Sequence, residues 1–207
     1  MGSGFWEGWR TRAASAKGVV FDYGGVIARA PGPDWPLYAQ SAAMGLSRAA
    51  LDAGFARYRR AYDLGEMTDA EMFGRIFSEN GLALSAADAA RLVDVEERGW
   101  TTLVPETLEL MRALKADGRK VGILTNMHAD FHRRRFAPVA AEHVALADAV
   151  AVSGLEGSGK PDRPIYDLMA ARMGLPARDL LFLDDNEANV EGARAAGWQA
   201  ERFLLPF

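Results

Sequence analysis

Short apolar runs that end at polar residues recur along this chain in a fixed order, and they constrain its fold more than any other feature. The runs are residues 18–21 before Asp22, 121–124 before Thr125 and Asn126, 149–152 before a loop that carries Lys160, and 180–183 before Asp184 and Asp185. Short apolar runs that are bounded by turn residues and separated by helical stretches predict parallel strands of an α/β sheet. Because ligands bind outside the carboxyl ends of such strands, we expect these polar side chains to meet at one site.

Proline and glycine mark the ends of the predicted helices between these runs. The helices extend from Pro105 to Gly118, from Pro164 to Gly174, and from the Asp184-Asp185 pair to Gly197. Proline is favoured in the first turn of a helix and glycine just past its last turn. Each helix leads to an apolar run, and residues 199–204 are expected to form a last strand. The sequence therefore predicts an α/β fold, a Rossmann-like three-layer core with a parallel sheet.

The stretch from residue 34 to residue 99 has a helical pattern instead. Apolar residues recur there at helical spacing, namely Leu51, Phe55 and Tyr58, and then Met72, Ile76 and Phe77. Thr68 followed by Glu71 is typical of a capping box at the start of a helix. We expect an N-terminal extension over 1–16, a core over 17–33 and 100–207, and a helical insert over 34–99.

Composition limits the classes of function. With 207 residues, 49% of them hydrophobic, the chain can bury a sizeable core. Its net charge of −4 argues against nucleic acid as a partner, and the absence of cysteine excludes disulfides, thiolate nucleophiles and cysteine-bound zinc. No run approaches about 18 consecutive apolar residues, which argues against a membrane partner. We expect a soluble, cytoplasmic protein.

The N-terminal stretch 1–16 is rich in aromatic residues. Phe5, Trp6 and Trp9 lie beside Arg10 and Arg12. Exposed tryptophans are unfavourable unless something covers them. The stretch either packs on its own core, which is the favoured interpretation, or forms a partner contact. A homodimer through this arm or through the helical insert is the corresponding prediction.

Motifs from Lys17 onward resemble the haloacid dehalogenase superfamily, most closely its phosphatase-like members with a helical cap after the first strand. The segments that carry the resemblance are residues 21–27, Leu124-Thr125-Asn126, Gly159-Lys160-Pro161 and 183–193. Each segment alone is weak, but their shared order is specific. The resemblance implies that the helical insert is a cap, and that the protein is a phosphatase acting on a small phosphorylated metabolite, with a sugar phosphate as the expected substrate class.

The resemblance also implies roles for individual residues. Asp22 would attack phosphorus and form an aspartyl-phosphate, which divides hydrolysis into two easier steps. Lys160 would neutralise the charges of Asp22 and of the phosphoryl group. Thr125 and the backbone amide of Asn126 would donate hydrogen bonds to phosphate oxygens. Glu66, in a segment similar to the cap loop that faces the active site of related phosphatases, either touches the substrate or only turns the chain.

A magnesium site is implied by the same motifs. Asp22, the backbone carbonyl of Gly24, Asp184 and Asp185 would form a hard-oxygen site for Mg²⁺, and Gly24 and Gly25 would contact the substrate. Paired carboxylates can also cap a helix, and both interpretations can hold together. The metal-independent dehalogenases of the superfamily depart from an Asp-Asp pair, so this pair favours phosphoryl chemistry.

Gly24 departs from the pattern of most phosphatases in the superfamily. The residue two after the nucleophile is usually a second Asp that protonates the leaving group. General acid-base assistance is typically worth about 10²- to 10⁴-fold in rate. Candidates to replace this acid are Asp34, Asp63, Glu66, His128 or a water molecule.

Two alternatives to a phosphatase stay open from the sequence. The first is a metal-independent 2-haloacid dehalogenase that uses Asp22 on carbon. The second is a catalytically weak protein of the same fold that binds a phosphate ligand, which the glycine at position 24 motivates.

Basic residues beyond Asn126 add little to this interpretation. His128 and His132 have the spacing of a zinc pair on a helix, but no acidic or cysteine motif completes it, so surface positions are expected. The alternative for His128 is a contact with the substrate, because it lies just beyond Thr125. The run 133–135 of three arginines is interpreted as a solvated face, or alternatively as an anion grip near the site.

Overall fold

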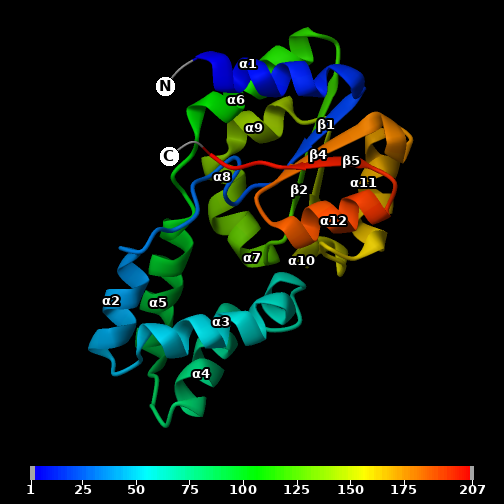
Figure 1. Cartoon of the computed structure of the whole chain (residues 1–207). Coiled ribbons are helices and arrows are strands. Elements are labelled where there is room, and N and C mark those ends of the chain that lie inside the picture. The colour runs from blue at the N-terminus through cyan, green and yellow to red at the C-terminus, as the bar shows by residue number, and fades with distance from the viewer. Residues whose placement is uncertain (1–2, 206–207) are drawn as a thin grey trace.

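The computed structural model describes residues 3–205, and within them the centre is a five-stranded parallel sheet in the order β3-β2-β1-β4-β5 (Figure 1). The strands are β1 Gly18–Phe21, β2 Lys120–Thr125, β3 Ala149–Val152, β4 Leu180–Asp184 and β5 Gln199–Arg202. The fold is the predicted α/β class with a parallel sheet. The last strand ends at Arg202, two residues before the predicted end, and Phe203 instead packs into the core.

Helices cover both faces of this sheet because successive side chains of a strand point to opposite sides. In β1, Val19 and Phe21 belong to one buried cluster and Val20 to the other. The first cluster packs against α1 Ser3–Arg12, α6 Pro105–Ala116 and α9 Ala141–Leu146, and the second against α11 Arg163–Met173 and α12 Glu187–Ala195. This arrangement is the predicted three-layer architecture.

Short elements occupy the loops between these layers. They are η1 Ala13–Ser15, α7 Ala129–Phe131, η2 His132–Phe136, α8 Ala137–Val139, α10 Ser153–Glu156 and η3 Ala177–Asp179. Of these, α10 follows β3 directly and α7 follows β2 after three residues, so both lie at the carboxyl edge of the sheet. Within residues 3–205, no helix has both the length and the apolar character needed to cross a bilayer.

Helices α2 to α5 form a separate helical unit beyond the sheet (Figure 1). Its helices are α2 Pro36–Ala43, α3 Arg48–Asp63, α4 Asp69–Glu79 and α5 Ala86–Gly99. They share a buried cluster of their own, which includes Leu51, Phe73 and Ile76. The predicted capping box is present, because Thr68 accepts from the Glu71 amide while the Glu71 side chain accepts from the Thr68 amide. The helical pattern predicted for this stretch is therefore confirmed.

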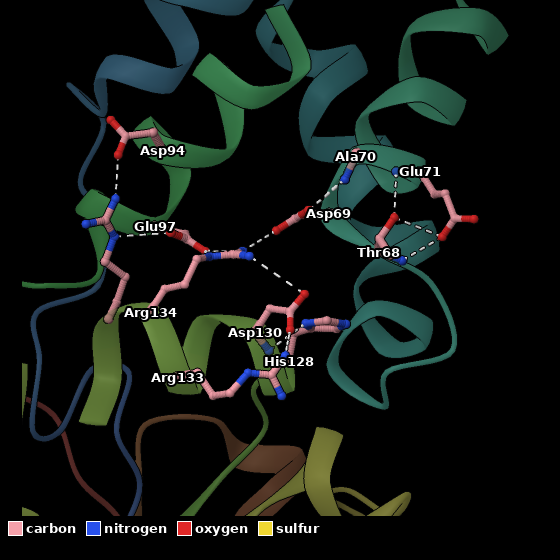
Figure 2. A network of polar contacts seen from close by, with 11 residues as sticks. Thr68, Asp69, Ala70, Glu71, Asp94, Glu97, His128, Asp130, Arg133 and Arg134 are labelled. Atoms are coloured by element: carbon pink, nitrogen blue, oxygen red, sulfur yellow. Dashed lines mark hydrogen bonds and ion pairs between the residues drawn. The ribbon is translucent and has the colours of Figure 1, made fainter. Parts of the chain in front are cut away.

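Arginine side chains of η2 tie the helical unit to the rest of the protein. Arg134 Nη2 lies 2.6 Å from Glu97 Oε1 of α5 and 2.6 Å from Asp69 Oδ2 of α4, as Figure 2 shows. Arg135 Nε contacts the other Glu97 oxygen at 3.1 Å and also pairs with Asp94. The Glu97 side chain is only 2% exposed, so its charge depends on these partners. Arg133 and Arg134 are exposed, as a solvated face predicts, but Arg134 and Arg135 also pair with carboxylates of the helical unit.

The N-terminal helix α1 packs on its own core. Trp9 is buried, with its ring centroid 4.9 Å from that of Phe203, and Phe5 lies 5.9 Å from the same ring. Aromatic pairs at such separations stabilise beyond their buried area. The favoured interpretation of this segment is confirmed, and a homodimer stays a prediction.

Matched glycine substitutions test the packing of the helical unit. A Cβ at Gly54 in α3 would lie 2.5 Å from Ile76 Cγ1, whereas nothing lies within 4 Å of a Cβ at Gly74 in α4. We expect Gly54→Ala to lower the free energy of unfolding by about 1–3 kcal/mol through overpacking. Gly74→Ala should raise it by up to about 1 kcal/mol through helix propensity. Urea unfolding midpoints check both changes, and a stabilised Gly54→Ala variant would contradict the packing.

Candidate active site

A buried lysine contacts two acidic residues that are distant from it and from each other in the sequence. Lys160 Nζ lies 2.7 Å from Asp22 Oδ1, just after β1, and 2.6 Å from Asp184 Oδ2, at the end of β4. The Lys160 side chain is only 1% exposed. Burial lowers the pKa of Lys160, but the charges of Asp184 and Asp22 outweigh this effect and raise it overall. The ammonium group therefore stays charged and holds both carboxylates.

Further hydrogen bonds fix the orientation of Asp184. Its Oδ1 accepts from the backbone amide of Asn186 at 2.8 Å, and its Oδ2 accepts from Asn189 Nδ2 at 3.0 Å. Tyr166 in turn donates its hydroxyl to the Asn189 carbonyl at 2.7 Å. The supporting roles of Asn189 and Tyr166 were not predicted. Asn189 lies five residues after Asp184, in the first turns of α12. This short spacing is the sequence signal from which the contact could have been predicted.

Asn126 positions the loop that carries Lys160. Its side-chain Nδ2 donates to the Lys160 carbonyl and its Oδ1 accepts from the Lys160 amide, each at 2.8 Å. This paired contact links the end of β2 to the loop after β3. Thr125, the last residue of β2, is buried and lines the same cleft as Asp22. The structure therefore brings Thr125 and Asn126 to the site, with the Asn126 side chain engaged by the loop.

Gly25 allows a close approach between two loops. It has a φ of +75°, in the left-handed region that favours glycine, and a Cβ there would collide with the Asp185 carboxylate. Asp185 is thereby held against the turn that follows Asp22.

Three carboxylates gather where the sequence predicts a metal. Asp22, Asp184 and Asp185 each offer an oxygen, and these atoms all lie within 4.8 Å of one another. Burial raises the pKa of Asp22 to about 7; Lys160 opposes this shift, and Asp184 and Asp185 add to it. Lys160 alone cannot neutralise three carboxylates. An oxygen-ligated divalent cation such as Mg²⁺ fits this donor set, since it prefers carboxylate ligands and offsets their repulsion.

A cleft of about 620 Å³ opens over these residues, between the sheet edge and the helical unit. Asp22, Thr125 and Lys160 line one side of it. Of the residues considered as replacements for the missing acid, Asp63 and His128 line the cleft. Asp34 and Glu66 are exposed and are not among its described lining residues. The role expected for Glu66 stays a prediction without a contact at the cleft.

The helical unit contributes a network of charges to the cleft. Arg59 donates from Nε to Asp63 at 2.9 Å and from Nη1 to Glu96 at 3.0 Å. Trp100 donates from Nε1 to the same Glu96 oxygen at 3.2 Å. Burial raises the pKa of both Asp63 and Glu96, while Arg59 opposes the shift. Asp63 and Glu96 therefore share Arg59 as their hydrogen-bond donor.

His128 lies in the cleft and not on the surface, so that expectation is wrong. It is 7% exposed, and its ring stacks on Tyr62 with centroids 4.8 Å apart. Its Nδ1 accepts from the Asp130 amide at 3.0 Å, which caps α7. His128 therefore precedes the helix, and His132 is not among the described residues that line the cleft. The zinc-like pair is not formed.

Trp100 fills the space beside Gly24. A Cβ at Gly24 would lie 3.0 Å from Trp100 Cζ3. The indole thus stands where a side chain at position 24 would begin, a feature that no local sequence pattern predicts.

Comparisons with known proteins agree with this geometry. A family model described as haloacid dehalogenase-like hydrolase matches residues 16–197. A phosphatase of Mycobacterium tuberculosis is 33% identical over 119 residues, 58% of this chain and 54% of that protein. A phosphoserine phosphatase of Thermus thermophilus is 29% identical over 182 residues, 83% of this chain and 71% of that protein. The chain spans about half the length of the first relative.

Solved structures share the fold. A HAD family enzyme of Bacteroides thetaiotaomicron, in complex with magnesium and inorganic phosphate, superposes with a TM-score of 0.66 at 18% identity, covering 90% of this chain and 93% of that chain.

Magnesium should stabilise the protein measurably. A cation that binds only the folded site adds about 2.7 kcal/mol at 100 times its Kd, so we expect MgCl₂ to raise the thermal unfolding midpoint. Asp185→Asn should remove most of the shift, and Asp167→Asn, an exposed control in α11, should keep it. A shift no larger than that of NaCl at equal ionic strength would contradict the metal site.

Proposed function

This chain belongs to the haloacid dehalogenase-like hydrolases, and on that basis we propose that it is a Mg²⁺-dependent phosphatase working through an aspartyl-phosphate. The observation that supports this most is the contact of Lys160 with Asp22 and Asp184 beside a third carboxylate, Asp185. Asp22, Lys160 and Asp185 line one cleft, and the buried Asp184 contacts Lys160, which supports their proposed roles as nucleophile, charge neutraliser and metal ligands. The phosphatase names of the relatives from M. tuberculosis and T. thermophilus support the same activity.

In the proposed first step, an Asp22 oxygen attacks phosphorus and displaces the leaving group. Lys160 Nζ, fixed by Asp184, lowers the charge repulsion between the carboxylate and the incoming dianion. Thr125 and the Asn126 amide donate hydrogen bonds to the phosphoryl oxygens, where charge develops. Asp22, Asp184, Asp185 and the Gly24 carbonyl would hold Mg²⁺, which would supply charge stabilisation when bound.

In the second step, water attacks the aspartyl-phosphate and frees Asp22. The positions of the reacting groups persist through both steps because the Asn126 pair holds the Lys160 loop and Asn189 holds Asp184. Such preorganised charges cost no reorganisation during the reaction.

The proposed substrate is a small phosphorylated metabolite. The sugar phosphate expected from the resemblance stays a prediction. The side of the cleft that the helical unit provides combines charged residues with aromatic ones, among them Trp35, Phe55 and the adjoining Trp100. The aromatic part of this lining favours a less polar leaving group.

Loss of the nucleophile should abolish turnover. With 4-nitrophenyl phosphate and Mg²⁺, we expect Asp22→Asn to lower kcat/KM by at least about 10³-fold, because the near-isosteric amide cannot form the covalent intermediate. Asp167→Asn provides the same chemical change at an exposed site and should retain activity. Phosphate release checks both variants.

The same assay separates the alternatives. Metal-independent turnover, or activity that survives in Asp22→Asn, would overturn the proposed function. Metal-free chloride release from 2-chloropropionate would favour the dehalogenase instead.

A further inference from the structure

We propose that the preferred substrate is the phosphate ester of an aromatic hydroxyl, whose oxygen leaves without a proton donor beside it; this inference rests on the proposed phosphatase function. Two independent features support it. One is the indole that occupies the space next to Gly24, and the other is the aromatic wall of the cleft.

Trp100 is held firmly in the space beside Gly24. A Cβ at Gly24 would lie 3.0 Å from Cζ3 and 3.4 Å from Cε3 of the indole. The Trp100 carbonyl accepts from the Tyr23 hydroxyl at 2.6 Å, and its Nε1 donates to Glu96 at 3.2 Å. The ring is thus fixed from both its backbone and its side chain. A side chain at position 24 would press against the indole, which would have to move by a few tenths of an ångström.

Besides Asp22 and Asp185 of the proposed metal site, the cleft is lined by two further acids among the described residues. Asp63 and Glu96 both accept hydrogen bonds from Arg59, which spans them. His128 accepts the Asp130 amide at Nδ1, the contact that caps α7. Each of these side chains therefore already has a hydrogen-bond partner within the protein.

The chemistry of the leaving oxygen then decides which esters react. When Asp22 forms its bond to phosphorus, the ester bond breaks and its electron pair stays on the leaving oxygen. An aryloxide is a good leaving group, because a phenol has a pKa of about 10 and its anion is only weakly basic. It then takes a proton from solvent. An alkoxide is far more basic and needs the acid that position 24 does not provide.

The intermediate is resolved by water alone. Water attacks phosphorus, Asp22 leaves as the carboxylate, and both water protons pass to the released phosphate before it equilibrates with solvent. No oxidant or further reactant is required. The identity of the leaving group matters only for the first step, so kcat/KM reports it.

The wall of the cleft suits a flat ring. Trp35 and Phe55 stack with ring centroids 6.0 Å apart and planes 21° apart, and Trp100 meets Trp35 edge-on at 6.5 Å. All three line the cleft that contains Asp22. An aromatic leaving group gains ring contacts there beyond its buried area. A polyol would find the nearby Arg59, Asp63 and Glu96 already paired with one another.

A pair of esters that share a ring tests the inference on the unmodified protein. Phenyl phosphate and benzyl phosphate both present a benzene ring, but only the first releases a phenol. With Mg²⁺ present, we expect kcat/KM for phenyl phosphate to exceed that for benzyl phosphate by at least about 10²-fold, the low end of what a general acid supplies. 4-Nitrophenyl phosphate should react faster still.

The outcomes separate this inference from the proposed function. Similar kcat/KM values for the two esters, with turnover that depends on Mg²⁺ and Asp22, would overturn the inference and leave the phosphatase standing. No turnover of 4-nitrophenyl phosphate would overturn the phosphatase itself.

Variants of the remaining acids complete the test. Asp63→Asn and His128→Gln should each leave the phenyl to benzyl ratio unchanged, even where both rates fall, because a structural effect lowers both esters together. A ratio that increases at least about 10-fold in either variant would identify that residue as a proton donor and overturn the inference.

Discussion

The site depends on one buried ammonium group that has carboxylate partners from two strands. Lys160 lies between Asp22 and Asp184, and removing its ammonium group would leave two buried carboxylates without their cationic partner. Much of the surrounding structure serves this contact. The Asn126 side chain fixes the backbone of Lys160, and Asn189 fixes the carboxylate of Asp184.

The parallel sheet explains why distant parts of the sequence can supply these groups. β1 pairs with both β2 and β4, so the residues after these strands meet at one edge without any local contact between them. The cleft then acquires a second side from the helical unit, where aromatic rings lie beside the paired charges of Arg59, Asp63 and Glu96. Phosphoryl chemistry and leaving-group recognition are thus supplied by different segments of the chain.

The strand-end residues could be predicted from sequence because apolar runs and turn residues reveal where parallel strands stop. Asp22, Lys160 and Asp184 come together as expected. Contacts across the cleft could not be predicted, because they depend on how the helical unit is oriented. Glu66 was selected from its loop and lies outside the described cleft lining, whereas Trp100 lies beside Gly24 although 76 residues separate them in the sequence.

The bridge from η2 to the helical unit has a consequence for how ligands meet this protein. Glu97 is buried and pairs with Arg134, as Figure 2 shows, and also with Arg135. Separating the helical unit from the core would break these ion pairs. The entropy cost of fixing the helical unit against the core is therefore met when the protein folds. The two sides of the cleft are therefore already ordered before a ligand binds. Binding then loses less free energy to the ordering of the protein.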